Sequence, residues 1–257
     1  MNIYQHFRLE EREFIDLVLH WKDYVDSSYT AKLTDFLDPR EQHILKVLIG
    51  ETGTIKYQLF GGIPGSERKR ALIMPDYLTP NEEEFQINLF EIDYPIKFVT
   101  IEHPQVLGSL MSLGLKRGKF GDILMKDGQV QFFAAAEISE YVKNNLESIG
   151  KASIRLKGLK LDEAITTNDL WMEQVTTVSS LRLDTIISGI HNISRQKSQL
   201  FIQQGLVKVN WTSIENVSFE CGEGDLLSVR GYGRVKILSI EGKTKKDKWR
   251  IVVGKQK

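Results

Sequence analysis

Apolar residues in the first 80 positions recur with helical spacing and then in two short runs. The spacing predicts a helix over residues 8–27, whose apolar stripe comprises Phe14, Leu17, Val18, Trp21 and Val25. A second helix is predicted from Asp38, a suitable cap, and Pro39, which suits a first turn, to Gly50. The runs at 55–60 and 70–75 predict a hairpin. Together these elements indicate an N-terminal α/β domain over residues 1–80.

The next part of the chain, residues 81–175, alternates between strand and helix patterns. The expected elements are a strand at 87–94, a helix at 104–115, a hairpin at 122–135, a helix at 138–149 and a strand at 153–161. This order is the split βαβ pattern, so we expect a central RNA-recognition-like domain. Phe132 and Phe133 are adjacent and point to opposite faces of a sheet. We interpret both as core residues rather than as base-stacking residues.

The pattern in residues 179–257 predicts two short helices followed by strands. The first helix is expected to be capped by Ser179 or Ser180, and its apolar stripe comprises Leu183, Ile186, Ile187 and Ile190. His191-Asn192 should end it, and Ser194 should cap a second helix over 195–204. This range is the third predicted domain, and the fold class of the whole chain is predicted to be α+β.

The net charge of zero hides an uneven distribution along the chain. Residues 180–257 have 14 Lys and Arg against 7 Asp and Glu, whereas residues 1–179 have 20 against 27. Such asymmetry suggests a polyanionic partner for the basic end. The alternative is a set of solvated surface lysines, and the arrangement of the basic residues on one face decides between the two.

Several classes of protein and site are disfavoured by composition. No apolar run reaches about 18 residues, and the first residues are too polar for a signal peptide, so we expect a cytoplasmic protein without a membrane partner. Cys221 is the only cysteine, which excludes an internal disulfide and a cysteine-based zinc site. The five histidines are scattered without metal-ligand spacing, and they are His6, His20, His43, His103 and His191. We therefore expect neither a metal nor a catalytic centre.

Short motifs follow one another in a fixed order in the basic part. They are Arg182-Leu183-Asp184, Ser194-Arg195, Gly205 with Val207, Val209 and Asn210, and Gly224-Asp225 before Val229-Arg230. This order resembles the S4 RNA-binding domain, which occurs in a ribosomal protein and in several RNA-modifying and tRNA-charging enzymes. Trp211 is a departure from the family pattern, because glycine is usual after the asparagine.

The chemistry of these motifs suits a phosphate backbone. A helix N-terminus offers unpaired N–H groups and partial positive charge, and Ser194 and Arg195 are predicted to lie at one. Asp184 is an acid in a basic segment, and we expect it to orient Arg182 or Arg195 by a charge-assisted hydrogen bond. The predicted RNA-binding residues are Arg182, Asp184, Ser194, Arg195, Lys197, Lys208, Asn210 and Arg230.

The segment HPQVLGSLMSLGLKRGKFGDI, residues 103–123, is similar to the central signature of the YlmH group of S4 proteins. The resemblance implies a non-enzymatic RNA-binding protein of Gram-positive bacteria. It implies binding to ribosomal RNA of the large ribosomal subunit through the S4 domain, together with peptidyl-tRNA, in the rescue of stalled ribosomes. The group's genes often neighbour cell-division genes, which leaves a division-linked role open. We expect a monomer without a cofactor.

Two basic loops are candidates for accessory RNA contacts. One follows the signature helix and contains Lys116, Arg117 and Lys119, for which a solubilising role is equally compatible with the sequence. The other lies near the C-terminus and contains Lys243, Lys245 and Lys246. We favour an electrostatic role for this second loop because it belongs to the basic part of the chain.

Two alternative functions remain open. Arg182-Leu183-Asp184 also resembles the catalytic string of a pseudouridine synthase, in which Asp184 would be the nucleophile. That string begins with histidine and has threonine before Ser-Gly, whereas this chain has Leu181 and Ile187 at those places. The second alternative is an adaptor whose acidic N-terminal part binds a division protein. We rank both below RNA binding.

Overall fold

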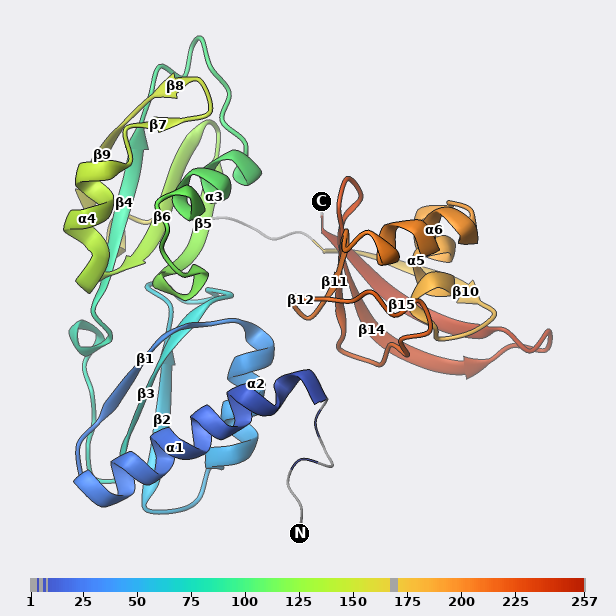
Figure 1. Ribbon diagram of the computed structural model, residues 1–257, viewed down its shortest axis with the longest axis horizontal. Coiled ribbons are helices and arrows are strands. Elements are labelled where there is room, and N and C mark those ends of the chain that lie inside the picture. The colour runs from blue at the N-terminus through green and yellow to red at the C-terminus, as the bar shows by residue number, and fades with distance from the viewer. Residues whose placement is uncertain (1–3, 5–6, 8, 167–170, 257) are drawn as a thin grey trace. The chain divides into compact units, whose positions relative to one another are not determined.

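The computed structural model describes residues 4, 7, 9–166 and 171–256. The chain forms two compact units, Met1–Thr167 and Asn168–Lys257, which are called here the N-terminal and the C-terminal unit (Figure 1). Arg8, at which the first predicted helix begins, lies outside the described residues, as does His6. Among the described residues, no helix is both long and apolar enough to span a membrane.

The first part of the N-terminal unit is a three-stranded antiparallel sheet with two helices against it (Figure 1). Its elements are α1 (Arg12–Ser28), β1 (Lys32–Leu37), α2 (Pro39–Ile49), β2 (Ile55–Phe60) and β3 (Lys69–Pro75), in sheet order β1-β3-β2. Helix α2 begins where predicted. The Asp38 carboxylate accepts a hydrogen bond from the Glu41 N–H at 2.9 Å, and the Glu41 carboxylate accepts one from the Asp38 N–H at 2.7 Å. This reciprocal cap confirms the predicted helix start.

Strand β1 was not expected from the sequence. Its segment lacks a regular alternation of apolar and polar residues. In the structure Thr34 is buried, and the pairing with β3 is irregular between Leu33 and Phe36. The Thr34 hydroxyl oxygen accepts a hydrogen bond from the Ala71 N–H of β3 at 2.9 Å. A contact over this sequence distance, rather than a local pattern, stabilises the strand.

The second part of the N-terminal unit is a four-stranded antiparallel sheet in the order β5-β6-β4-β9. Its main elements are β4 (Ile87–Asp93), α3 (His103–Ser112), β5 (Phe120–Lys126), β6 (Gln129–Ala135), α4 (Ser139–Asn145) and β9 (Arg155–Leu159). The order of elements confirms the predicted split βαβ arrangement. The β5–β6 hairpin turns at Asp127 and Gly128, whose φ angles of 49° and 83° suit this turn.

The second helix of this sheet is shorter than predicted. α4 ends at Asn145, and the predicted helix end at Gly150 is instead the turn of a two-stranded hairpin, β7 (Ser148–Ile149) and β8 (Ala152–Ser153). Gly150 has φ 58°, a conformation that suits a turn as well as a helix end. The glycine therefore indicated that the chain changes direction here, but the sequence did not show whether it does so at a helix end or in a hairpin turn.

Short 3₁₀ helices complete the N-terminal unit. They span Leu9–Glu11, Glu82–Phe85, Arg117–Lys119, Ala136–Ile138 and Leu161–Glu163. Phe132 and Phe133 are both fully buried, which confirms that they are core residues. On one face of the sheet Phe132 stacks on Phe90, with ring centroids 5.5 Å apart.

The C-terminal unit is a six-stranded antiparallel sheet in the order β10-β15-β14-β13-β11-β12, with two helices side by side (Figure 1). Its elements are β10 (Trp171–Val178), α5 (Leu183–His191), α6 (Arg195–Gln203), β11 (Val207–Val209), β12 (Thr212–Ser213), β13 (Leu226–Val229), β14 (Gly233–Lys243) and β15 (Trp249–Gln256). The apolar stripe of α5 packs with the inner side chains of the strands in one buried cluster. The mixture of helices and strands in both units confirms the predicted α+β class.

The ends of the two helices agree in part with the sequence. Asn192 ends α5 with φ 52°, and the Ser194 hydroxyl caps α6 by accepting a hydrogen bond from the Lys197 N–H at 3.2 Å. Both were predicted. The predicted serine cap of α5 is wrong, because the cap residue is Arg182, whose own N–H donates to the Ser180 hydroxyl at 3.3 Å.

Strand β10 was not predicted, and the expected domain ranges place most of it in the central domain. It pairs along its whole length with β15, from Trp171 opposite Gln256 to Val178 opposite Trp249. Several of its side chains are exposed, including Met172 and Val175. Because the strand has no clear apolar face, only its pairing with β15 identifies it.

Candidate nucleic-acid interface

Asp184 is the centre of a charged cluster at the start of α5. Its carboxylate is completely buried, with 0% of the side chain exposed, and both oxygens accept hydrogen bonds. Oδ2 accepts from Arg195 Nε at 2.9 Å and from Gln199 Nε2 at 2.8 Å. Arg182 donates to both oxygens, from Nε at 3.2 Å and from Nη2 at 3.3 Å. These four residues are called here the Asp184 cluster. Asp184 was expected to orient Arg182 or Arg195, and it is hydrogen-bonded to both.

The Asp184 carboxylate stays ionised because of these donors. Burial alone would raise its pKa, but the hydrogen bonds from Gln199, Arg195 and Arg182 outweigh burial and lower the pKa to about 2. Its negative charge is therefore present at any physiological pH. Two guanidinium groups against one carboxylate give the cluster one excess positive charge.

The two arginines keep donors for a ligand. The Arg195 side chain is 52% exposed and that of Arg182 is 34% exposed. A guanidinium has five N–H donors, of which Arg195 uses one for Asp184 and Arg182 uses two. Within the described residues, the structure records no partner for the remaining donors. The cluster thus holds two planar cations in place while their outer edges face solvent, an arrangement that suits phosphate oxygens.

The N-terminus of α6 adds backbone donors beside the cluster. The first N–H groups of a helix have no intrahelical acceptor, and at α6 they belong to Arg195 and Gln196. The start of α5 is different, because the Leu183 N–H donates to the Phe219 carbonyl at 2.8 Å. Of these two helix ends, α6 is therefore the one that suits an anion.

Lys197 and Arg230 extend the positive surface. The Lys197 ammonium lies 5.7 Å from the ring centroids of both Phe201 and Tyr232, which fixes a flexible side chain by cation–π contacts. Tyr232 belongs to the turn between β13 and β14, and the Tyr232 and Phe201 rings are 5.7 Å apart. Arg230 is exposed in the same turn. The ring contacts thus attach this turn to α6.

Two predicted residues are not part of this surface. Lys208 lies between the buried Val207 and Val209 of β11, so its side chain points away from the sheet face that contributes to the core with α5. Asn210 is used within the fold. Its Nδ2 donates to the Asp225 carboxylate at 2.7 Å, and its Oδ1 accepts from the Leu226 N–H at 2.9 Å. The structure therefore brings together Arg182, Asp184, Ser194, Arg195 and Lys197, with Arg230 in the turn that contacts α6, but not Lys208 or Asn210.

Gln199 and the two rings under Lys197 were not predicted as parts of the site. Gln199 is four positions after Arg195, so both side chains lie on the same face of α6 and reach Asp184 together. That spacing is the sequence signal that could have found Gln199. No comparable local signal exists for Tyr232, because it is far from Phe201 in the sequence.

The predicted accessory loop of the N-terminal unit is largely occupied by internal contacts. The Lys119 ammonium forms ion pairs with Asp35 at 2.6 Å and with Glu137 at 2.9 Å, and these hydrogen bonds raise its pKa although burial lowers it. The Arg117 guanidinium donates to the carbonyls of Phe120 at 2.6 Å and Gly121 at 3.2 Å. Lys116 is exposed.

The loop between β14 and β15 is more open. Lys245 and Lys246 are exposed. Lys243 forms an ion pair with Asp247 at 2.7 Å, and its ammonium lies 5.6 Å from the Trp249 ring centroid. Lys248 of the same loop is exposed as well, so the loop offers three exposed lysines besides Lys243, which is partly neutralised.

The sheet face that an RNA-recognition domain would use is covered. The backbone of Gly62 lies so close to the Phe133 ring that a Cβ there would be 2.5 Å from it. At the other end of this face, Gln131 is 1% exposed, and its side-chain carbonyl accepts a hydrogen bond from the Ile165 N–H at 2.8 Å. The first part of the unit and the segment at 160–165 thus close both ends of the platform.

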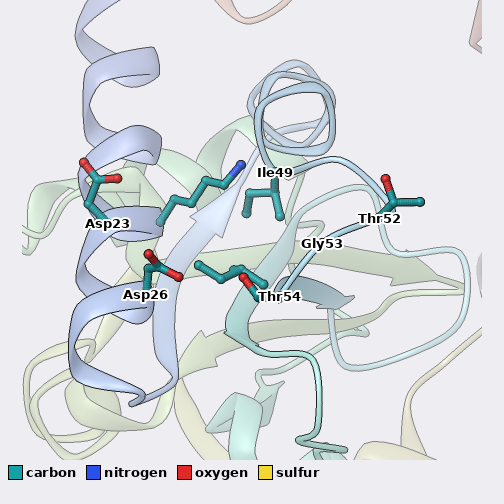
Figure 2. A pocket seen from close by; sticks show the side chains of 8 residues that line it. Asp23, Asp26, Ile49, Thr52, Gly53 and Thr54 are labelled. Atoms are coloured by element: carbon teal, nitrogen blue, oxygen red, sulfur yellow. The ribbon is translucent and has the colours of Figure 1, made fainter.

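The N-terminal unit also has an open hollow of about 260 Å³ between α1 and the loop before β2 (Figure 2). Asp23 and Asp26 line it from α1, and Thr52, Gly53 and Thr54 line it from the loop (Figure 2). The Lys22 ammonium is engaged with the Leu48 carbonyl at 3.1 Å. Two carboxylates make this hollow unsuitable for a phosphate. In the described part of the chain, no three His, Cys, Asp or Glu residues are grouped as a metal site would require.

Comparisons with known proteins cover the whole chain. Three family models match: "YlmH, N-terminal" over residues 10–88, "Putative RNA-binding domain in YlmH" over 80–163 and "S4 domain" over 181–227. A protein of Bacillus subtilis (strain 168) named "Ribosome-associated protein quality control protein P2" is 46% identical over 257 residues, which are 100% of this chain and 99% of the relative. A solved structure named "Cell division protein ylmH from Streptococcus pneumoniae" is 34% identical, with a TM-score of 0.55, and the match covers 64% of this chain and 100% of that one.

Proposed function

Because this chain belongs to the YlmH family of S4-domain proteins, we propose that its C-terminal unit binds structured ribosomal RNA in ribosome-associated quality control. The Asp184 cluster is the observation that carries the proposal. One buried carboxylate orients two arginines outward beside the open N-terminus of α6. The name of the B. subtilis relative supports the ribosomal part.

The proposed contacts are to the RNA backbone. Arg182 and Arg195 donate to phosphate oxygens, the first amides of α6 bind a phosphate, and Lys197 and Arg230 neutralise neighbouring ones. Such contacts give affinity and orientation without reading the sequence. Each neutralised phosphate should steepen the salt dependence of binding by a slope of about 0.7 to 0.9.

The finer assignment follows the family resemblance. The RNA belongs to the large ribosomal subunit, a peptidyl-tRNA lies beside it, and the protein acts in the cytoplasm as a monomer. Lys116, Lys243, Lys245 and Lys246 serve as accessory contacts, whereas Arg117 and Lys119 are better explained by their internal partners. Lys208 contacts RNA only if the nucleic acid also reaches the other face of the sheet.

The test compares two double variants of the full chain that remove the same charge. Arg182→Gln with Arg195→Gln should weaken binding to large ribosomal subunits by about 100-fold, because two charge-assisted contacts are lost. Lys126→Gln with Lys151→Gln removes two exposed lysines of the N-terminal unit and should change it less than about 3-fold. Sedimentation with purified subunits measures both. Equal losses for the two variants would rule out a localised contact.

The proposed function includes no chemical step. A nucleophilic carboxylate must reach its substrate, and Asp184 is buried under four side-chain donors, the fourth being the Thr185 hydroxyl. Pseudouridine mapping on ribosomal RNA incubated with the protein tests this point. Modification that disappears in an Asp184→Asn variant would instead establish the synthase alternative.

A further inference from the structure

Trp211 has a backbone conformation that bulky residues rarely adopt. It forms the turn between β11 and β12 together with Asn210, and the φ angles are 48° for Asn210 and 66° for Trp211. A two-residue turn of this kind favours asparagine first and glycine second, because only glycine avoids the steric cost of positive φ. A tryptophan here is therefore unfavourable for the backbone, and its ring must supply an interaction that a glycine could not.

The ring is paired with a cation on the sheet face opposite the helices. The Arg234 guanidinium carbon lies 5.8 Å from the Trp211 ring centroid. Strand pairing places Lys208 opposite Ser228 and Ser228 opposite Arg234, so these residues share one face. Their neighbours Val207, Val209 and Val235 are in the core. Trp211 and Arg234 are each partly exposed, and Lys208 is exposed on the same face.

A ligand that matches this surface needs a flat π system next to negative charge. An unpaired nucleotide has both, since its base stacks on aromatic rings and guanidinium planes while its phosphates attract lysine and arginine. A paired base does not suit the site, because its faces are covered within the duplex. The Asp184 cluster would thus contact one part of the RNA, and Trp211 with Arg234 would contact another part of the same RNA.

We propose that Trp211 and Arg234 form a stacking platform for one unpaired nucleotide of the RNA, with Lys208 near its phosphate. This rests on the proposed function, because the RNA is the one bound through the Asp184 cluster. It adds a second contact on the other face of the sheet. It also gives Lys208 a role that the Asp184 cluster does not.

The test uses the full chain and a series of RNA hairpins in which a one-nucleotide bulge is moved along the stem, together with the same hairpin without a bulge. The wild-type protein should prefer at least one bulged hairpin. Trp211→Gly should weaken binding to that hairpin by about 10-fold, as expected for the loss of one stacked base, and change binding to the paired hairpin less than about 2-fold. Trp211→Phe, which keeps a stacking ring, should restore most of the preference.

Glycine is also the control for folding. It fits the left-handed conformation better than tryptophan, so Trp211→Gly should not lower the melting temperature of the C-terminal unit. A lower melting temperature with equal losses on both hairpins would show a structural role and overturn the platform. Binding without any preference for a bulge would overturn it too, yet leave the proposed function standing. If the wild type binds neither hairpin nor ribosomal subunits, the proposed function fails as well.

Discussion

The charge clusters of the two units differ in their ratio of acids to bases. In the C-terminal unit, one carboxylate of Asp184 supports the two arginines 182 and 195, and both remain partly exposed. In the N-terminal unit, the Lys119 ammonium lies between the carboxylates of Asp35 and Glu137, and Glu137 is also paired with the buried Arg70 guanidinium at 3.2 Å, so two acids balance two bases. The first cluster has a cation to spare for a ligand, whereas the second has none. The ratio of acids to bases within contact distance, rather than the number of basic residues, therefore indicates where an anion can bind.

The two sheets also differ in whether one of their faces is accessible to a ligand. The sheet containing β6 resembles an RNA-recognition platform in its order of strands, but Gly62 and Gln131 show that its free face is covered from both ends. The sheet containing β14 has an aromatic residue, Trp211, and a cation, Arg234, partly exposed on its outer face. The likeness of the β6 sheet to an RNA-recognition domain in its strand order therefore does not imply that it binds RNA through the same face.

Loss of the Asp184 carboxylate should have the largest effect. In an Asp184→Ala variant, Arg182, Arg195 and Gln199 lose their common acceptor, and we expect the free energy of unfolding of the C-terminal unit to fall by about 3 kcal/mol. RNA affinity should fall together with it. Hydrogen exchange resolved by peptide should show faster exchange in the C-terminal unit only. Glu241→Ala, which removes an exposed ion pair with Arg250, is the matched control and should change stability by less than about 0.5 kcal/mol.

An added methyl group at Gly62 tests whether the central platform is closed. Gly62→Ala places a Cβ 2.5 Å from the Phe133 ring and also strains a residue at φ 103°, so the N-terminal unit should lose about 2 to 3 kcal/mol of stability. Gly65→Ala is the control, because Gly65 has φ 84° but no atom within 4 Å of the place that an added methyl group would take, and it should cost only about 1 kcal/mol. Thermal unfolding measures the difference. Equal costs would mean that the contact with Phe133 is unimportant.

The stability of the two units should depend on pH with opposite signs. The pKa of Asp184 is lowered from 3.8 to about 2, so its contribution is present above about pH 4 and is lost as the pH falls towards 2. Burial, with the neighbouring Asp38 charge, raises the pKa of Glu41 from 4.5 to about 7. The folded N-terminal unit therefore holds a proton that the unfolded chain releases, and its stability falls as the pH rises from 4.5 to about 7.

Hydrogen exchange of both units across this pH range measures the two slopes. The loss in the C-terminal unit between about pH 4 and 2 should be on the order of 2 kcal/mol. Glu41→Gln retains a side chain that can accept from the Asp38 N–H but cannot titrate, so it should reduce the slope of the N-terminal unit and leave that of the C-terminal unit unchanged. Burial also raises the pKa of Asp38 and of Asp122, and these two carboxyls account for the slope that remains. Slopes of the same sign in both units would contradict the assignment of these two carboxylates.

The smallest effects are expected from two single substitutions, one of which should weaken RNA binding and the other of which should lower the stability of the N-terminal unit. Arg195→Gln should weaken RNA binding by about 10-fold, because one charge-assisted contact is lost, with little change in the N-terminal unit. Lys119→Gln should destabilise the N-terminal unit by about 1 kcal/mol and leave RNA affinity unchanged. Filter binding and thermal unfolding of both variants provide the comparison. An RNA defect in Lys119→Gln would return this lysine to the RNA-binding surface.

Local features of the fold could be predicted from the sequence. The start of α2 at Asp38, the hairpin turn at Asp127, the end of α5 at Asn192 and the cap of α6 at Ser194 all agree with the structure. Each depends on contacts within about four residues, which the sequence displays directly. The order of the S4 motifs likewise identified the segment in which the charged cluster forms.

Elements stabilised by distant partners could not be predicted in this way. Strand β1 depends on a hydrogen bond between Thr34 and Ala71, and β10 depends on pairing with β15, the last strand of the chain. Neither strand has the alternation of apolar and polar residues by which strands are recognised. Their identification required the complete sheet.

The sequence by itself determined the family, the arrangement of helices and strands around the S4 motifs, and the set of basic residues from which an RNA-binding surface could be built. Only the tertiary structure decided which of these residues are available. Lys119 meets Asp35 from 84 positions away, Asn210 is engaged by Asp225, and Lys208 points to the other face of its sheet. The physical reason is that a side chain's charge is local to its residue, whereas its partners and its exposure are properties of the packed chain.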